Sequence, residues 1–289
     1  MSVTRAVNGR FLPRPFLKWV GGKRQLLPEL LARVERAGAF GRYHEPFVGG
    51  GALFFELHRL GKLKKYAWLS DYNPRLIETY EGLRDHVEEV IALLEGHKAR
   101  HSEEHFYKVR ALGKGPERAG ETLPERAARI IYLNKTCYNG LYRENSKGEF
   151  NSPFGRYKNP QICDEDNLRA ASRALKKAKI ETRHFKTIVE RAKPGDLVYF
   201  DPPYHPVSKT ASFTSYDRGG FGEDSQRLLA RVYAQLDRKG VRVLLSNSMT
   251  DIVQDIYSAF IIDEVSANRA VNSRADRRGK VREALVRNF

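Results

Sequence analysis

Cysteine is scarce in this sequence of 289 residues. Only Cys137 and Cys163 are present, and no group of cysteines and histidines has the spacing of a metal site. Disulfide frameworks are typical of oxidising compartments, so two isolated thiols favour a reducing cytoplasm. The sequence therefore predicts a cytoplasmic protein that needs no metal ion.

Long apolar runs are also absent. No stretch approaches the roughly 20 apolar residues that a transmembrane helix requires. The opening segment, MSVTRAVNGR, lacks the apolar core of a secretion signal. We therefore expect no membrane partner, and the length allows one large or two smaller domains with a substantial core.

Acidic residues are few relative to basic ones. The chain has 35 Asp and Glu against 51 Lys and Arg, which gives a formal net charge of +16. Such an excess favours a polyanionic partner, and nucleic acid is the first candidate. The alternative is a basic soluble protein without such a partner.

One segment, DLVYFDPPY at 196–204, combines a strand pattern with polar chemistry. Its apolar run Leu197–Phe200 follows Gly195 and stops at Asp201, as expected of a buried strand that ends in a rigid loop. In open α/β sheets, ligands bind at the carboxyl ends of the strands. Asp201 is therefore expected at a ligand crevice, although a strand followed by a diproline turn without a site remains an alternative.

The residues after this predicted strand suit a planar amine. Pro202 and Pro203 cannot donate backbone hydrogen bonds and each fixes its own φ, so the carbonyls of Asp201 and Pro202 are expected to be rigid acceptors. Tyr204 adds a flat ring. The acceptors would bind the amine hydrogens, and the ring would stack on the planar system that carries them.

Two glycine segments lie earlier in the chain. Residues 16–23 read FLKWVGGK, but a phosphate loop is excluded because Leu17 stands where its first glycine is required. Residues 43–55, YHEPFVGGGALFF, predict a short strand that enters Glu45 and a glycine turn that lets a ligand approach the backbone. As a dinucleotide fingerprint this turn is incomplete, because Phe54 occupies the third glycine position.

An acidic residue ends the next predicted strand. The strand at 66–69 leads into Ser70 and Asp71, about 20 residues past the glycine turn, where an acid accepts hydrogen bonds from ribose hydroxyls. The same geometry serves NAD or S-adenosylmethionine. Asp71 could instead cap the helix predicted at 73–83.

The remaining pattern predicts an α/β fold with a largely helical insertion between about 76 and 180. Further strands are expected at 180–185, 197–200, 241–248, 261–267 and 283–289, which gives about seven in total, with helices at 225–236 and 250–260.

The centre of the insertion, residues 132–157, alternates aromatic, basic and amide side chains with glycines. Arginine can bridge two guanine acceptors in the major groove, and asparagine pairs with adenine. Turn signals at Asn139-Gly140 and Lys147-Gly148 predict a β-hairpin, which could be a bare structural device or could present contacts to nucleic acid.

In their order, these segments resemble the Dam-type DNA adenine methyltransferases. DPPY is similar to their catalytic motif, FLKWVGGK to their opening motif, and the glycine turn to their cofactor loop. CYNGLYR and GEFNSPFGRY resemble their recognition hairpin for GATC, and FTSY at 213–216 resembles the loop after DPPY. The resemblance implies a Rossmann-like seven-stranded methyltransferase sheet, S-adenosylmethionine as cofactor and double-stranded DNA as partner. The reaction implied is methyl transfer to the 6-amino group of a flipped-out adenine.

The resemblance also implies residue roles. Catalytic residues would be Asp201, Pro202 and Tyr204. Cofactor-binding residues would be Trp19, Lys23, Glu45, Phe47, Gly49, Gly51, Asp71 and Asp201. DNA-binding residues would be Lys18, Tyr138, Asn139, Leu141, Arg143, Pro153, Arg156, Ser215 and Tyr216, of which Arg143 would read a guanine and Arg156 a phosphate. Tyr142 and residues 144–146 occupy variable positions of the pattern, where flanking preference could differ.

We therefore expect a catalytic domain at 1–75 and 180–289 and a target-recognition domain at 76–179. Alternatives are an amino-methyltransferase acting on another DNA site, on RNA or on a protein amide, and a DNA-binding homologue without activity. A nicotinamide-dependent oxidoreductase is disfavoured by Phe54 and DPPY. A restriction endonuclease acting on the same site could be a functional partner, with no direct contact implied.

Overall fold

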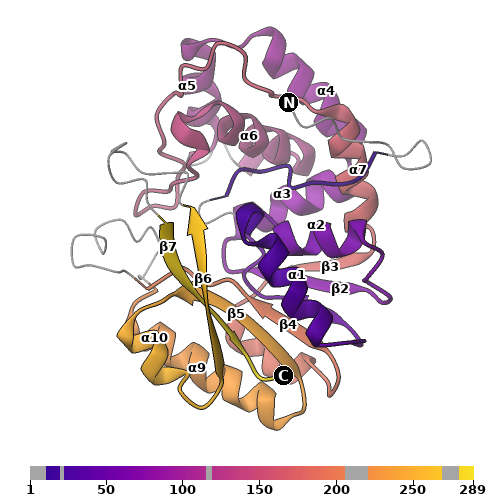
Figure 1. Ribbon diagram of the computed structural model, residues 1–289. Coiled ribbons are helices and arrows are strands. Elements are labelled where there is room, and N and C mark those ends of the chain that lie inside the picture. The colour runs from indigo at the N-terminus through magenta and orange to yellow at the C-terminus, as the bar shows by residue number, and fades with distance from the viewer. Residues whose placement is uncertain (1–10, 20–22, 115–118, 206–220, 269–279) are drawn as a thin grey trace. The chain divides into compact units, whose positions relative to one another are not determined.

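The computed structural model describes residues 11–19, 23–114, 119–205, 221–268 and 280–289 (Figure 1). The chain forms two compact units, each built from segments that are distant in sequence. We call the first the helical unit, which comprises Met1–Gly22, Gly49–Lys62 and Asn73–Thr182. The second is the sheet unit, which comprises Lys23–Val48, Leu63–Tyr72 and Arg183–Phe289.

The helical unit is organised around α6. Its elements are α2 (Ala52–Arg59), α3 (Pro74–Asp85), α4 (Val87–Ala99), α5 (Glu103–Leu112), α6 (Leu123–Thr136), η3 (Tyr138–Gly140), α7 (Glu165–Leu175) and β3 (Ala178–Thr182). A capping box formed by Thr122 and Glu125 begins α6. α6 packs against α3, α4 and α5 at once, and most of its side chains are therefore buried.

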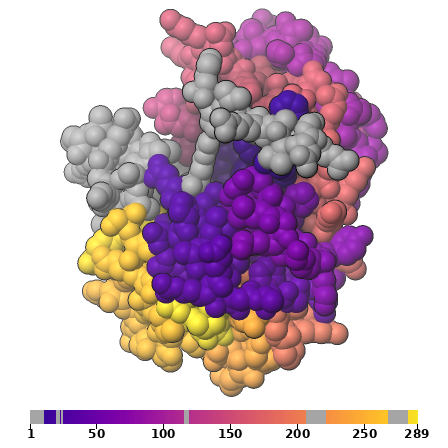
Figure 2. Space-filling view, turned by 45° about the vertical axis from the view of Figure 1, so that its right-hand side comes forward, coloured from indigo at the N-terminus to yellow at the C-terminus, as the bar shows by residue number. Residues whose placement is uncertain are grey.

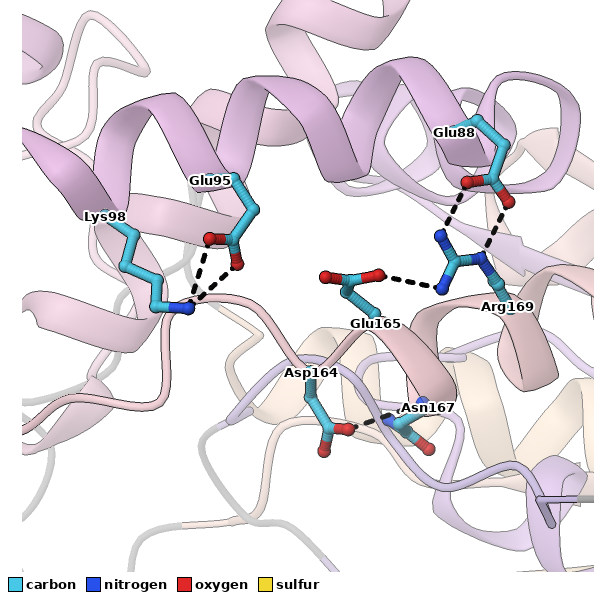
Figure 3. A network of polar contacts seen from close by, with 7 residues as sticks. All are labelled: Glu88, Glu95, Lys98, Asp164, Glu165, Asn167 and Arg169. Carbon is cyan, nitrogen blue, oxygen red and sulfur yellow. Dashed lines mark hydrogen bonds and ion pairs between the residues drawn. The ribbon is translucent and has the colours of Figure 1, made fainter.

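Polar contacts join α4 to α7 at the surface of the helical unit (Figure 3). The guanidinium of Arg169 on α7 donates to both carboxylate oxygens of Glu88 on α4, each at 2.8 Å. It also donates to Glu165, one turn earlier on α7, at 2.8 Å. The Asp164 side chain accepts a hydrogen bond from the backbone N–H of Asn167 and so caps the start of α7.

The strands form one mixed sheet in the order β3-β2-β1-β4-β5-β7-β6. Those of the sheet unit are β1 (Tyr43–Glu45), β2 (Ala67–Asp71), β4 (Leu197–Phe200), β5 (Arg242–Ser248), β6 (Ile261–Asn268) and β7 (Lys280–Arg287). β1 pairs in parallel with β2 and β4, and β4 with β5, whereas β7 runs antiparallel to both β5 and β6. The chain order reverses between β1 and β4, which is where ligands bind in open α/β sheets.

Helices cover the sheet unit. They are η1 (Lys23–Gln25), α1 (Leu27–Arg36), η4 (Phe185–Thr187), α8 (Ile188–Arg191), α9 (Glu223–Arg238) and α10 (Asp251–Ile256). Alternate side chains of β4, β5 and β7 enter one apolar core with α8, α9 and α10. The outer face of α9 carries exposed charged residues such as Arg227, and orange side chains of this part of the chain lie at the surface in Figure 2.

The structure confirms the predicted α/β fold with a seven-stranded mixed sheet. Boundaries differ in places: the strand expected at 180–185 is β3 at Ala178–Thr182, and β7 ends at Arg287. The helix expected at 250–260 is only α10, Asp251–Ile256. Among the described residues, no helix combines the length and apolar character needed to cross a membrane.

The hairpin expected at 132–157 is wrong in its first part. Residues 132–136 belong to α6, and Asn139 and Gly140, both at positive φ, lie in η3. Antiparallel pairing is limited to two isolated bridges, Cys137 with Phe154 and Glu144 with Phe150. The predicted division into a catalytic domain and a recognition domain at 76–179 is a functional one and stays a prediction.

The helical unit contains a buried and an exposed arginine–glutamate pair of the same geometry. Arg129 donates to both carboxylate oxygens of Glu121 at 2.7 and 2.8 Å, and the two side chains are only 3% and 12% exposed. We expect Arg129→Leu to lower the free energy of unfolding by about 3–5 kcal/mol, because it leaves the Glu121 carboxylate buried without its counter-ion. Urea unfolding would measure the change.

The matched control is Arg169→Leu. Its pair with Glu88 has the same two-bond geometry, but the side chains are 36% and 64% exposed. Because solvent screens an exposed pair, this variant should lose much less stability. Equal losses in the two variants would contradict the assignment of the difference to burial.

Candidate active site

Strand register gathers polar side chains at one edge of the sheet unit. The pairing of β4 with β5 sets Asp201, the residue after β4, opposite Ser246. The pairing of β5 with β7 sets Ser248 opposite Glu283. Because side chains two apart on a strand share a face, these groups all lie on the face opposite the apolar core. Glu45, at the end of β1 beside β4, joins this edge.

Asp201 is held through one of its two carboxylate oxygens. The Nζ of Lys23 lies 2.9 Å from Oδ1, and the Ser246 hydroxyl donates to the same oxygen at 2.9 Å. The Tyr199 hydroxyl lies 3.0 Å from that of Ser246. Among the described residues, no side chain or backbone donor bonds Oδ2. The carboxylate is therefore oriented while one oxygen stays available to a ligand.

The diproline loop is braced by hydrogen bonds on both sides. Gln226 of α9 donates to the carbonyl of Pro203 at 3.1 Å, and its own side-chain oxygen accepts from Asn247 at 3.0 Å. Asn247 in turn accepts from the backbone N–H of His205 at 3.0 Å. Within the described parts of the chain, the carbonyl of Pro202 has no such partner, and its role as a ligand acceptor stays a prediction.

Tyr204 lies between a cation and a carboxylate. Its hydroxyl donates to Oε2 of Glu283 at 2.7 Å, and the Nζ of Lys23 lies 4.2 Å from the centre of its ring. Lys23 and Glu283 are 6% and 8% exposed. Glu283 thus fixes the hydroxyl end of the ring and Lys23 lies over one of its faces, so that the other face would present a rigid flat surface.

Burial raises the pKa of the Asp201 carboxyl above its usual value. The positive charge and hydrogen bond of Lys23 oppose this rise, as does the hydrogen bond from Ser246, whereas the negative charge of Glu283 adds to it. The protonation of Asp201 therefore depends on three named neighbours. Among the described residues, no group of histidine, cysteine and carboxylate side chains has the arrangement of a metal site.

Two predicted cofactor residues, Glu45 and Phe47, are engaged in protein contacts. Glu45 is 2% exposed and accepts a hydrogen bond from the Tyr43 hydroxyl at 2.8 Å. The ring of Phe47 stacks on Phe185 at 5.2 Å and meets Phe221 edge-on at 5.6 Å. Their roles toward a cofactor stay predictions, because these contacts explain why both are well positioned without showing a ligand.

Asp71 ends β2 and does not cap the following helix. The N-cap of α3 is Asn73, whose side chain accepts hydrogen bonds from Arg75 and Leu76. The alternative reading of Asp71 as a helix cap is therefore wrong. Its neighbour Tyr72 is 65% exposed, and no pattern in the sequence indicates so exposed an aromatic side chain at this position.

The glycine turn lies in the helical unit against two side chains. A Cβ at Gly49 would lie 2.7 Å from Cδ1 of Trp19, and one at Gly51 would lie 2.9 Å from the Tyr80 hydroxyl. Both glycines have positive φ, and Tyr80 donates to the carbonyl of Gly49 at 3.0 Å. The glycines thus allow Trp19 and Tyr80 to approach the backbone of this turn, and the predicted approach of a ligand stays a prediction.

The predicted DNA-binding residues of the helical unit come from two segments of the chain that hydrogen bonds link. The backbone of Lys18 exchanges two hydrogen bonds with the Asn134 side chain, at 2.8 and 2.7 Å, and that side chain also donates to the carbonyl of Gly140 at 3.3 Å. The backbone N–H of Tyr138 bonds the carbonyl of Pro153 at 2.8 Å. Lys18, in the segment that resembles the family's opening motif, is therefore linked through Asn134 to residues 137–157, which we call the recognition segment.

Exposure differs among these residues. Those that are exposed are Lys18, Tyr138, Asn139, Pro153 and Arg156, whereas Leu141 and Arg143 are half-buried. The other two predicted contacts, Ser215 and Tyr216, lie outside the described residues.

Comparison with known proteins gives the family. The family described as D12 class N6 adenine-specific DNA methyltransferase matches residues 19–271. The chain belongs to this family. The Dam-type resemblance is thereby confirmed, and the chain is an adenine-specific DNA methyltransferase.

Curated relatives extend over nearly the whole chain of this methyltransferase. It is 41% identical over 278 residues to type II methyltransferase M1.LlaDCHI of Lactococcus lactis subsp. cremoris, covering 96% of this chain and 95% of that one. It is 42% identical over 289 residues to type II methyltransferase M.MjaIII of Methanocaldococcus jannaschii, covering 96% and 99%. It is 34% identical over 278 residues to DNA adenine methylase of Serratia marcescens, covering 94% and 97%.

Ser246 and Glu283 are polar residues of this edge that sequence reasoning missed. Ser246 begins the polar run Ser246–Ser248 at the end of the strand Arg242–Ser248, and this change from apolar to polar residues in a buried strand was the available signal. Glu283 reads as an ordinary start of the last strand, and only the pairing of β7 with β5 shows where it lies.

We predict opposite shifts in the pH dependence of methyl transfer for two variants of this edge. If the ionised Asp201 is required, activity falls as pH drops through its pKa. Ser246→Ala removes a hydrogen bond that lowers this pKa, so the fall should move to higher pH. Glu283→Gln removes a charge that raises it, so the fall should move to lower pH while an acceptor for Tyr204 is kept.

The measurement is kcat against pH, with Glu264→Gln as control. Glu264 lies on β6, is 46% exposed and pairs with Arg282 at 3.3 Å. Its loss should leave the profile unchanged. Shifts of the same sign in Ser246→Ala and Glu283→Gln would contradict the electrostatic account of Asp201.

Proposed function

We propose that this enzyme transfers a methyl group from S-adenosylmethionine to the 6-amino group of adenine in double-stranded DNA, at the site GATC. One observation carries the proposal. The Asp201 carboxylate stands at the carboxyl end of β4 with Oδ1 held by Lys23 and Ser246, while Oδ2 has no partner among the described residues.

The proposed chemistry follows from the weakness of the nucleophile. The lone pair of the adenine amine is delocalised into its ring, so the amine attacks poorly while it is planar. Hydrogen bonds from its two protons to Oδ2 of Asp201 and to the carbonyl of Pro202 would favour a tetrahedral nitrogen. The lone pair is then localised, and positioning and electrostatics supply most of the acceleration. Asp201 either takes the released proton or only orients the amine.

Residues near Asp71 fit the proposed cofactor. A carboxylate at the end of β2 suits ribose hydroxyls, and the exposed ring of Tyr72 beside it offers a flat surface for a base. In the helical unit, Trp19 packs against the glycine turn, and Trp19 and the turn are both proposed to contact the cofactor. S-adenosylmethionine would supply an electrophilic methyl group on its sulfonium sulfur.

The target adenine must leave the duplex, because a stacked base cannot bring its amine to a carboxylate at a strand end. The Tyr204 ring, held by Glu283 and Lys23, would then stack on the flipped base. The formal net charge of +16 supports phosphate contacts that carry much of the affinity and make it fall with salt.

The GATC assignment rests on the recognition segment. Arg143 is proposed to bridge a guanine, Leu141 and Pro153 to meet the thymine side, and Tyr138 and Asn139 to act at the central step. The two relatives of 41% and 42% identity are named type II methyltransferases, which favours a modification role beside an endonuclease of the same site.

Transfer of a labelled methyl group to two short duplexes, one with GATC and one with that site scrambled, tests the proposal. We expect label on the GATC duplex alone. Label on both duplexes would support methyl transfer to DNA but would contradict GATC as the recognition site. In the same assay Asp201→Ala should abolish transfer, because the amine loses its acceptor. A near-normal rate would show that the centre lies elsewhere.

Arg143→Ala should lower discrimination at one guanine by about 1–3 kcal/mol, the usual worth of a bidentate base contact. The measurement is kcat/KM on duplexes that carry each single substitution in the site.

Arg156→Ala is the matched control, since it removes an exposed arginine of the same segment that is proposed to contact a phosphate. It should weaken binding to all duplexes alike. It should also reduce the slope of the logarithm of the binding constant against the logarithm of salt concentration by about one. A uniform loss in Arg143→Ala would make that residue a phosphate contact instead.

A further inference from the structure

Tyr142 lies in the segment CYNGLYR, which resembles the family's recognition hairpin, and it is nearly buried in this chain. Only 8% of its surface is exposed, although it lies between two residues proposed to contact DNA, Leu141 and Arg143. Its ring stacks on that of Trp19, with centroids 5.0 Å apart and planes inclined by 26°. A residue of the recognition segment therefore packs directly on Trp19 of the opening motif.

Trp19 also lies close to the backbone of the glycine turn. A Cβ at Gly49 would lie 2.7 Å from Cδ1 of Trp19, and one at Gly50 would lie 3.3 Å from its Cβ. Trp19 thus lies between the backbone of the proposed cofactor turn and the ring of Tyr142. All of these residues belong to the helical unit.

Tyr142 is anchored on its other sides. Its hydroxyl donates to Oε1 of Glu144, which also accepts from the Asn73 side chain at 3.4 Å. Phe150 meets its ring edge-on at 5.5 Å. Because the ring has little freedom, a displacement of Trp19 must be matched by Tyr142 or must break the stack.

We propose that the Trp19–Tyr142 stack couples occupancy of the cofactor turn to the binding of target DNA, which rests on the proposed function. A ligand on the turn restricts Trp19, and the stack passes this restriction to Tyr142. Tyr142 then holds Leu141 and Arg143 in the arrangement that DNA selects. Tyr142 is a positioning residue in this scheme, since it needs to touch neither the cofactor nor a base.

Binding affinities test the coupling without catalysis. S-adenosylhomocysteine, which has no methyl group to transfer, is titrated by calorimetry with and without a GATC duplex. The duplex, labelled with a fluorophore, is titrated by anisotropy with and without S-adenosylhomocysteine. In the wild type each ligand should tighten the other by the same factor, within roughly 5–150-fold, because coupling of binding is reciprocal.

Tyr142→Leu removes the flat ring and should bring this factor to about one, while S-adenosylhomocysteine alone binds as in the wild type. Tyr142→Phe keeps the ring and should keep the factor. If the leucine variant does not fold by circular dichroism, Tyr142→Met replaces it, since a flexible thioether fills irregular space with less strain.

Tyr107→Leu is the matched control. Tyr107 is a half-buried tyrosine of α5 that packs on Phe106 and Arg110 in the same unit, and its loss should leave the factor unchanged. An unchanged factor in Tyr142→Leu, an equal loss in Tyr107→Leu, or a wild-type factor of one would each overturn the coupling. Failure of S-adenosylhomocysteine to bind the wild type without DNA would instead refute the proposed function, and the coupling with it.

Discussion

Strand register in the sheet unit is the constraint on which the polar edge around Asp201 depends. A slip of one residue between β4 and β5 would turn Asp201 or Ser246 toward the apolar core that α9 covers. A carboxylate buried there without partners would cost on the order of several kcal/mol. In the observed register Asp201 meets Lys23 and Ser246 instead. The apolar core and the polar edge are therefore two faces of one pairing, and neither can change without the other.

A feature could be predicted from the sequence where the residues that indicate it are neighbours in the chain. Asp201 was found because an apolar run, an acid and two prolines stand next to one another in the chain. The seven-stranded fold was found from similarly local patterns. Ser246 and Glu283 were missed because their relation to Asp201 exists only through pairing of strands far apart in sequence. The carboxylate and Lys23 were thus predictable as site residues, whereas Ser246 and Glu283, which also shift the pKa of Asp201, were not.

The wrong hairpin boundary shows two local signals in competition. The turn signal at Asn139-Gly140 favours a strand before it, but the capping box of Thr122 and Glu125 begins a helix that runs to Thr136. This helix packs against α3, α4 and α5, which buries Ile130, Ile131 and Leu133. The capping box was readable in the sequence, and it was the stronger predictor.

The glycine turn illustrates why a residue pattern does not identify a single cause. Gly49 is required by positive φ and by the ring of Trp19 even before any ligand is considered. Trp19 in turn packs on Tyr142. The ring of Trp19 therefore has a packing role in the helical unit besides the role toward a cofactor that the resemblance implies, and neither role excludes the other.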